Sequence, residues 1–193
     1  MAISYPLTPP DNVNFAKIVF TPKTVVTSTA SAFTGQEQTY SYTGQWWEVD
    51  ITLIVKKRYS IAPWLGFLLA LNGKSGTFYL GDSVGRLPQG TIAGAVTVGA
   101  GAIANTTTLP ISGGTGSFAV GDWLQVGNNL HMVMQVNAGS VDVFPTLRSA
   151  YANGTSIVYN NPLGLFRLKA PVPFAAIENK LYDGLLISAK EAI

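Results

Sequence analysis

The sequence predicts a mainly β protein: a β-sandwich or split-barrel core domain with one flanking α-helix, and a small inserted domain resembling a β-barrel. Three observations lead to this prediction. Residues 47–53 alternate between apolar and polar side chains, which is the pattern of a half-buried strand. Residues 61–71 change to the three-to-four spacing of a helix. Most of the remaining chain consists of short β-prone runs between turns that contain glycine or proline.

The strand around residues 47–53 is expected to have one buried face and one wet face. Its apolar residues share a face: Trp47, Val49, Ile51, Leu53 and Val55. The polar residues between them occupy the other face. Trp46 points to the side opposite Trp47, so one of the two indoles is expected to lie outside the core of this domain.

The helix is predicted over residues 60–72. Ser60 is placed to cap the first turn, Pro63 is early enough to be tolerated, and Asn72-Gly73 supplies the stop. The apolar stripe is wide enough that the helix must cover a sheet. Leu68 and Leu69 are therefore both expected to be buried against that sheet.

The strands before the helix are predicted from β-branched and aromatic runs. Thr21-Pro22 separates the run that ends at Phe20 from a second run over residues 23–29, and Thr43-Gly44 turns into the tryptophan strand. Three or four antiparallel strands are therefore expected before the helix.

Two changes in composition divide the chain. One lies at residues 87–90 and the other at residues 160–164, and between them the chain is almost uncharged and rich in short strands. Residues 1–90 and 164–193 are predicted to form a discontinuous core domain. Residues 91–163 are predicted to form an inserted small β domain.

The composition also limits the classes of partner. Hydrophobic residues make up 47% of the chain and charged residues only 11%, against about a quarter in typical domains. This shortage of charge indicates faces covered by other copies or other chains, although a neutral, glycine-rich β protein is an alternative. The formal net charge of +2 gives no electrostatic footprint for nucleic acid or membrane, so neither is expected as a partner.

Segments that direct a chain to a membrane or out of the cell are not apparent. The N-terminal residues lack a basic region followed by an apolar run, and the longest apolar run, near residues 61–71, is too short to span a bilayer. The absence of cysteine excludes disulfides, thiolate zinc sites and thiol catalysis. A soluble protein without a secretion signal is expected.

Residues with catalytic potential are few. The single histidine, His131, has no carboxylate at a spacing that suggests a catalytic or metal site, so a structural or interface role is expected. Asp82 and Asp122 each follow a glycine, and turn formation explains them better than a carboxylate pair does. The glycine runs lack the lysine and helix of a phosphate-binding loop. No catalytic, cofactor-binding or metal-binding residues are predicted.

Exposed aromatic residues are the best candidates for contact with another molecule. The predicted interface residues are Trp46, Phe33, Tyr40 and Tyr42, because large aromatics often anchor protein interfaces. Trp46, Tyr40 and Tyr42 are also suited to stacking on a sugar. Both interpretations remain open from the residues alone.

Four segments resemble the minor tail proteins of long-tailed, siphovirus-like bacteriophages, and more narrowly their distal tail proteins. They are Phe33-Thr34-Gly35-Gln36, Gln45-Trp46-Trp47-Glu48, the helix that contains Trp64, and the run from Asn72 to Asp82. The resemblance covers mainly residues 30–90. It is weaker at residues 145–148 and in the C-terminal strand.

This resemblance implies a structural virion protein without catalytic residues or cofactors. Such proteins form a six-fold ring around the DNA channel in the tail and join the tail tube to the tip complex. The implied partners are other copies of the chain in a hexamer, the tail tube protein, the tip or hub proteins and the tape-measure protein. The implied location is the virion tail, assembled in the host cytoplasm. Alternatives are a tail tube protein, a carbohydrate-binding module for host-surface glycans and, least supported, an enzyme.

Overall fold

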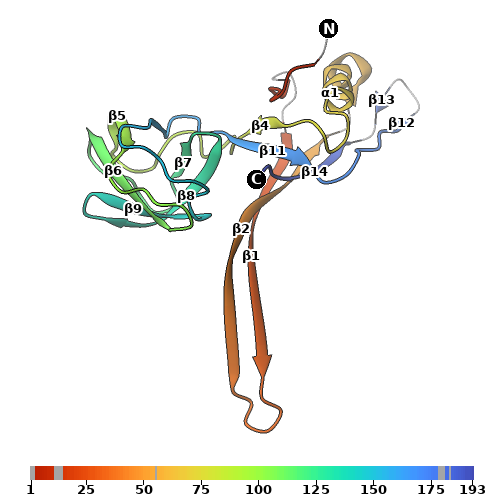
Figure 1. Cartoon of the computed structure of the whole chain (residues 1–193). Coiled ribbons are helices and arrows are strands. Elements are labelled where there is room, and N and C mark those ends of the chain that lie inside the picture. Colours follow the sequence, from red (N-terminus) through yellow and green to blue (C-terminus); the bar gives the residue numbers. More distant parts are fainter. Residues whose placement is uncertain (1–2, 11–14, 55, 178–180, 183) are drawn as a thin grey trace.

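The structure is a computed structural model of the 193-residue chain and describes residues 3–10, 15–54, 56–177, 181–182 and 184–193. It has three parts: a five-stranded sheet covered by a helix, a six-stranded barrel, and a hairpin arm that extends away from both (Figure 1). The predicted fold class, mainly β with one helix and a barrel-like sheet, is confirmed for these residues.

The helix-covered sheet combines strands from both ends of the chain. In spatial order it consists of β1 (Phe15–Ala30), β2 (Glu37–Leu53), β14 (Leu186–Glu191), β11 (Gly164–Leu168) and β4 (Phe78–Leu80). All neighbouring strands are antiparallel. A small sheet of β12 (Ala176–Ile177), β13 (Leu181–Tyr182) and β3 (Lys56–Lys57) adjoins the start of the helix.

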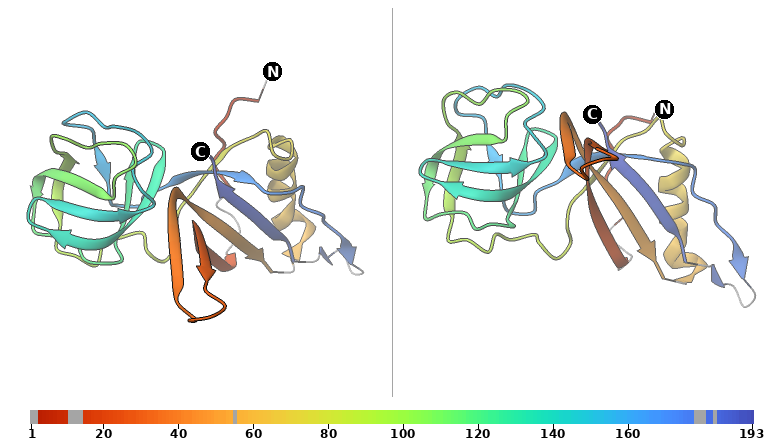
Figure 2. Two further views of the ribbon diagram at one scale, coloured as in Figure 1. Left: turned by 60° about the horizontal axis from the view of Figure 1, so that its bottom comes forward. Right: turned by 90° about the horizontal axis from the view of Figure 1, so that it is seen from below.

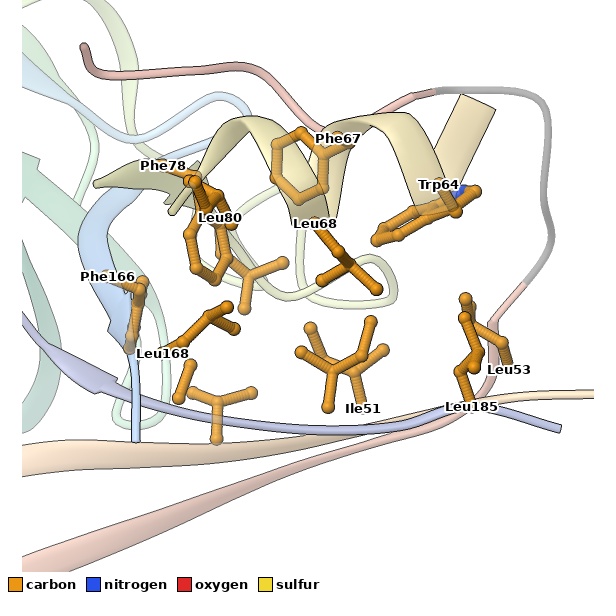
Figure 3. Packing of buried hydrophobic residues seen from close by; sticks show 14 of the residues in the cluster. Ile51, Leu53, Trp64, Phe67, Leu68, Phe78, Leu80, Phe166, Leu168 and Leu185 are labelled. Atoms are coloured by element: carbon orange, nitrogen blue, oxygen red, sulfur yellow. The ribbon is translucent and has the colours of Figure 1, made fainter. Parts of the chain in front are cut away.

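Helix α1 (Arg58–Ala70) covers one face of this sheet. Trp64 and Leu68 point from the helix toward Ile51, Leu53 and Leu185 on the strands and the segment beneath (Figure 3). The tryptophan strand, now part of β2, presents its alternating apolar residues to this core as predicted. Val55, which was expected to continue that face, lies outside the described residues.

The limits of the helix differ from the prediction of residues 60–72. The helix starts at Arg58, and Lys57, at the N-cap position, makes no side-chain capping bond, so the prediction that Ser60 caps the first turn is wrong. Pro63 is consequently the sixth helical residue, where its missing N–H removes one backbone hydrogen bond. The predicted stop is confirmed: Asn72 and Gly73 both have positive φ, 48° and 63°, which ends the helical path.

Leu69 corrects a second expectation about the helix. Leu68 is buried, but Leu69 is 69% exposed. The residues that face the sheet follow the helical period: Ile61, Trp64, Phe67, Leu68 and Leu71. Consecutive helical residues are separated by about 100° around the axis, and Leu69 falls on the solvent side of Leu68.

In the described residues, three strands precede the helix, within the expected three or four, but their limits differ from the prediction: β1 and β2 are long, and β3 has only two residues. β1 passes through Thr21-Pro22 without interruption, and β2 passes through Thr43-Gly44 in the same way. Pro22 is tolerated because β1 is the edge strand of its sheet. At Gly44, a Cβ atom would lie only 2.9 Å from the Val25 side chain, so the glycine allows the facing strand to approach.

The barrel is built from residues 93–158. Its strands, in spatial order, are β10 (Ile157–Val158), β7 (Trp123–Val126), β8 (Asn129–Asn137), β9 (Ser140–Phe144), β6 (Thr108–Thr115) and β5 (Ala93–Val98). A bridge between Thr97 and Ser156 joins the two ends of this order and nearly closes the sheet. The barrel core is aliphatic, with Leu109, Leu124 and Val143 fully buried.

The barrel and the helix-covered sheet share a packed junction. Trp123 and Leu130 belong to the barrel strands, yet their side chains join the core cluster of the helix-covered sheet. The ring of Trp47 lies 5.0 Å from that of Trp123 and 4.9 Å from that of Phe144, measured between centroids. That the two parts divided at residues 90 and 163 fold independently stays a prediction. The contacts of Trp47 with Trp123 and Phe144 show that the two parts share buried side-chain contacts.

Candidate assembly surface

The arm consists of residues 24–43, the outer part of the β1–β2 hairpin. Every residue in this range is exposed. The two strands pair from Val26–Ser41 to Ala30–Glu37, after a bulge between Thr24 and Val26. Seen along the arm, the barrel and the helix-covered sheet lie on either side of its base (Figure 2). The arm therefore has no apolar cover from its own chain.

The predicted interface residues are distributed along this hairpin. Phe33 is at the tip and is 100% exposed, while Tyr40 and Tyr42 are about half exposed on the arm part of β2. Trp46 is half-buried at the root, where the arm joins the sheet. Alternation places Tyr40 and Tyr42 on one face of the arm part of β2, and the bulge lies between them and Trp46. The structure thus places all four along one hairpin, from Phe33 at the tip to Trp46 at the root.

Charged groups hold the Trp46 indole at the root. Its Nε1–H donates to Glu48 Oε1 at 3.4 Å, and Glu48 Oε2 accepts from Lys169 Nζ at 3.0 Å and lies 3.7 Å from Lys23 Nζ. The hydrogen bond from Lys169 is the main cause that lowers the pKa of the Glu48 carboxyl. The indole is therefore fixed against the outer face of the sheet.

A hollow of about 420 Å³ lies beside this indole, and we call it the Trp46 hollow. Its lining residues come from β2, β11 and the C-terminal end of the chain: Trp46, Arg167, Lys190, Glu191, Ala192 and Ile193. Arg167 is held by a hydrogen bond from Nη1 to the Lys74 carbonyl oxygen at 3.1 Å. The hollow thus combines an aromatic ring and aliphatic groups with two cationic side chains.

A buried ion pair underlies the hollow and joins the sheet to the barrel. Arg148 Nη2 lies 2.7 Å from Glu191 Oε2, which also accepts the Trp47 backbone N–H at 3.2 Å. Burial raises the pKa of the Glu191 carboxyl, and the Arg148 hydrogen bond partly opposes this effect. Two further bonds cross the junction: Trp47 Nε1–H donates to the Leu130 carbonyl at 3.1 Å, and Gln45 Oε1 accepts from Thr146 N–H at 3.0 Å.

His131 is fully buried in the barrel near this junction. Its Nδ1 lies 2.8 Å from the Pro145 carbonyl oxygen, to which the ring donates. Burial lowers its pKa from 6.5 to about 4, and the positive charge of Arg148 acts in the same direction. These contacts support the structural role expected for this residue.

Asp82 and Asp122 hold turns rather than forming a carboxylate pair. Asp82 accepts from Val84 N–H at 2.9 Å and from the Trp123 indole at 3.1 Å. Asp122 is buried and accepts from the backbone N–H groups of Gln89, Gly90 and Ala119. Asp82 also lines a hollow of about 520 Å³, so the carboxylate there is already bound by protein groups.

Within the described residues, no group of three or more His, Asp or Glu side chains is placed to hold a metal ion. In the same part of the chain, no helix is long and apolar enough to cross a membrane.

Sequence reasoning missed the cations of the hollow and the buried ion pair. Arg167 and Lys190 lie on strands far from Trp46 in the sequence, and only the strand order of the sheet brings them together. Glu191 had a usable signal, because it alternates with the apolar Ile187 and Ala189 on the core side of β14. A charge in that position implies a buried partner.

Comparisons with known proteins add no assignment to these observations. No protein-family model and no curated protein matches the chain.

Proposed function

We propose that this protein is a self-assembling structural protein that uses the arm to contact neighbouring copies, and that it forms a ring in a bacteriophage tail. The main support for self-assembly is the exposure of the arm. Every residue from 24 to 43 is exposed, and Glu37 is the only charged side chain among them. An isolated two-stranded hairpin is at best marginally stable in water, so such an arm gains most from a partner surface.

The rest of the sheet edges support this assignment of the arm. The edge of β4 is covered by Leu7, whose backbone N–H donates to Thr77 and whose carbonyl accepts from Tyr79. The base of β1 carries Lys17, Pro22 and Lys23, residues that discourage pairing with another strand. The barrel is nearly closed. The arm is thus the long unprotected edge of the described chain.

The place of the protein in a tail rests on the sequence resemblance. A ring needs a heterologous contact, in which one surface of each copy meets a different surface of the next. An arm that extends away from the body supplies one such surface. On this basis the protein is a distal tail component that joins the tail tube to the tip complex around the DNA channel. A tail tube protein is the alternative position.

Measurement of mass over a dilution series tests the proposal. The parent chain is expected to sediment at several times 20.5 kDa, and electron micrographs are expected to show rings. Trp46→Ala is expected to weaken association by about 2 kcal/mol or more if the indole anchors the contact. A parent that remains monomeric at every concentration would contradict self-assembly, and an equally stable oligomer of the variant would exclude only Trp46.

Glycan binding is a second candidate, supported by the exposed rings of Tyr40 and Tyr42 on one face of the arm. A carbohydrate-binding module would be expected to melt at a higher temperature in the presence of its glycan. It would also work as a monomer. The same mass measurement therefore separates the two functions.

A further inference from the structure

The tip of the arm has a fixed shape that presents Phe33. Ser31 N–H donates to the Gln36 carbonyl at 2.9 Å, and Gly35 N–H donates to the Ser31 carbonyl at 2.9 Å. Gly35 has a φ of +68°, which closes the turn in a conformation that favours glycine. The backbone bonds leave Phe33 fully exposed, with the carboxylate of Glu37 at the start of the adjoining strand.

The Trp46 hollow has the complementary chemistry. It offers the Trp46 ring together with the aliphatic groups of Ala192 and Ile193, and the cations Lys190 and Arg167 contribute to the lining. Within the part of the chain that the structure describes, Lys190 and Glu37 take part in no ion pair. Glu191 also lines the hollow, but its carboxylate is paired with Arg148. An aromatic tip with one carboxylate therefore matches an aromatic hollow with two cations.

The arm cannot reach the hollow of its own chain. The strands run from the Lys23–Trp46 pair at the root to the Ala30–Glu37 pair near the tip. Seven residues of strand span about 23 Å at roughly 3.3 Å per residue. Because the strands are paired from Val26–Ser41 outward, the paired part of the arm cannot fold back to bring its tip to its own root.

We propose that the arm tip of one copy binds in the Trp46 hollow of a second copy, with Phe33 against Trp46 and Glu37 beside Lys190 and Arg167. This inference rests on the proposed self-assembly and names the contact that produces it. The charge of the tip favours this site, which has two cations and a carboxylate, Glu191, that Arg148 already pairs. The larger hollow has one cation, Arg86, beside the Asp82 carboxylate. Each copy then gives one tip and receives one tip, which is the head-to-tail contact that a closed ring requires.

The absence of cysteine from the native chain permits a direct test by cross-linking. Thr34→Cys in one sample and Ala192→Cys in another are mixed and mildly oxidised. A disulfide requires Cα atoms within about 7 Å, so a covalent heterodimer in the mixture, absent when Ser83→Cys replaces Ala192→Cys, is the expected result. Cross-links only between two Thr34→Cys copies would place the tips side by side and overturn the proposal.

Charge exchange provides the second test. Glu37→Lys and Lys190→Glu are each expected to weaken association at least tenfold, and the two changes combined in one chain are expected to restore most of it. Arg86→Glu, an exposed cation outside the hollow, serves as the control.

The outcomes separate this contact from the proposed function. If Phe33→Ala abolishes association while Lys190→Glu leaves it unchanged, the arm assembles the protein through another surface and the hollow is excluded. If the parent is monomeric and the mixed cysteine variants give no heterodimer, both the contact and self-assembly are contradicted.

Discussion

The inner and outer halves of the β1–β2 hairpin have the same strand pairing but different surroundings. In the inner half, Trp47, Val49, Ile51 and Leu53 are buried beneath the helix and beside the barrel. In the outer half, residues 24–43 are exposed on both faces. The outer half is rich in Thr, Ser and Tyr, which favour strands without requiring a core. The comparison shows that strand formation extends well beyond the region where burial stabilises it.

Trp47→Ala is expected to cause the largest loss of stability. The substitution removes three aromatic contacts, to Phe20, Trp123 and Phe144, and leaves the Leu130 carbonyl without its indole donor. The free energy of unfolding is expected to fall by about 3–5 kcal/mol, as measured by chemical denaturation. Trp47→Phe retains a ring and is expected to lose less. A fall below about 1 kcal/mol for the alanine variant would mean that the junction contributes little to the inner half.

Two neighbouring leucines of α1 test how the helix packs on the inner half of the hairpin. Leu68→Ala is expected to lower the free energy of unfolding by about 2–5 kcal/mol, because it leaves a cavity between helix and sheet. Leu69→Ala is expected to change it by no more than about 0.5 kcal/mol, since Leu69 is exposed. Equal effects of the two substitutions would contradict the orientation of the helix.

His131 is expected to make the stability of the junction dependent on pH. Its folded pKa, about 4, is below the value of 6.5 for the free side chain. The unfolded chain therefore binds the proton first, and stability present above pH 6.5 is lost as the pH falls toward 4. The loss is on the order of 3 kcal/mol.

A pH series of unfolding free energies for the parent and for His131→Gln provides the check. The variant is expected to show a flatter profile between pH 6.5 and 4. Glu191, with its raised pKa, acts in the opposite direction, because its protonation below the folded pKa favours the folded state. A variant with the same slope as the parent would exclude His131 as the source of the dependence.

Substitutions in the outer half are expected to have the smallest effect on the subunit. Tyr42→Ala and Phe33→Ala should each leave the free energy of unfolding of the dilute protein within about 0.5 kcal/mol of the parent, because neither side chain is buried. A loss comparable to that of Trp47→Ala would indicate that the arm packs against its own chain.

The sequence predicts local patterns in this protein better than it predicts long-range contacts. Alternation at Trp47 and the helical spacing near Trp64 are confirmed, because each depends on neighbouring residues. The predicted break between strands at Thr21-Pro22 is wrong, because the tolerance for Pro22 depends on its position at a sheet edge. The Arg148–Glu191 pair and the Trp46 hollow require the strand order and could not be derived from local patterns.

Replacement of residues 91–163 by a short Gly/Ser linker illustrates the difference between local patterns and long-range contacts. The sequence predicts that the remaining chain would fold without them. The structure shows that such a chain would lose Arg148, the partner of buried Glu191, together with the Leu130 carbonyl that accepts from Trp47. The free-standing core domain thus stays a prediction, and in it Glu191 would keep the Trp47 N–H but lack its cationic partner.

The junction also determines the direction of the arm. Gln45 and Trp47, which bond to Thr146 and Leu130 of the barrel unit, are the residues of β2 directly below the arm. The barrel is therefore hydrogen-bonded to β2 at the point where the exposed part of the hairpin begins. The arm is long, and its contacts with the barrel are confined to its base. A small rotation of the barrel that turned the base of β2 would displace Phe33, at the far end of the arm, by a larger distance. A force applied to the barrel would then change the position of the arm tip.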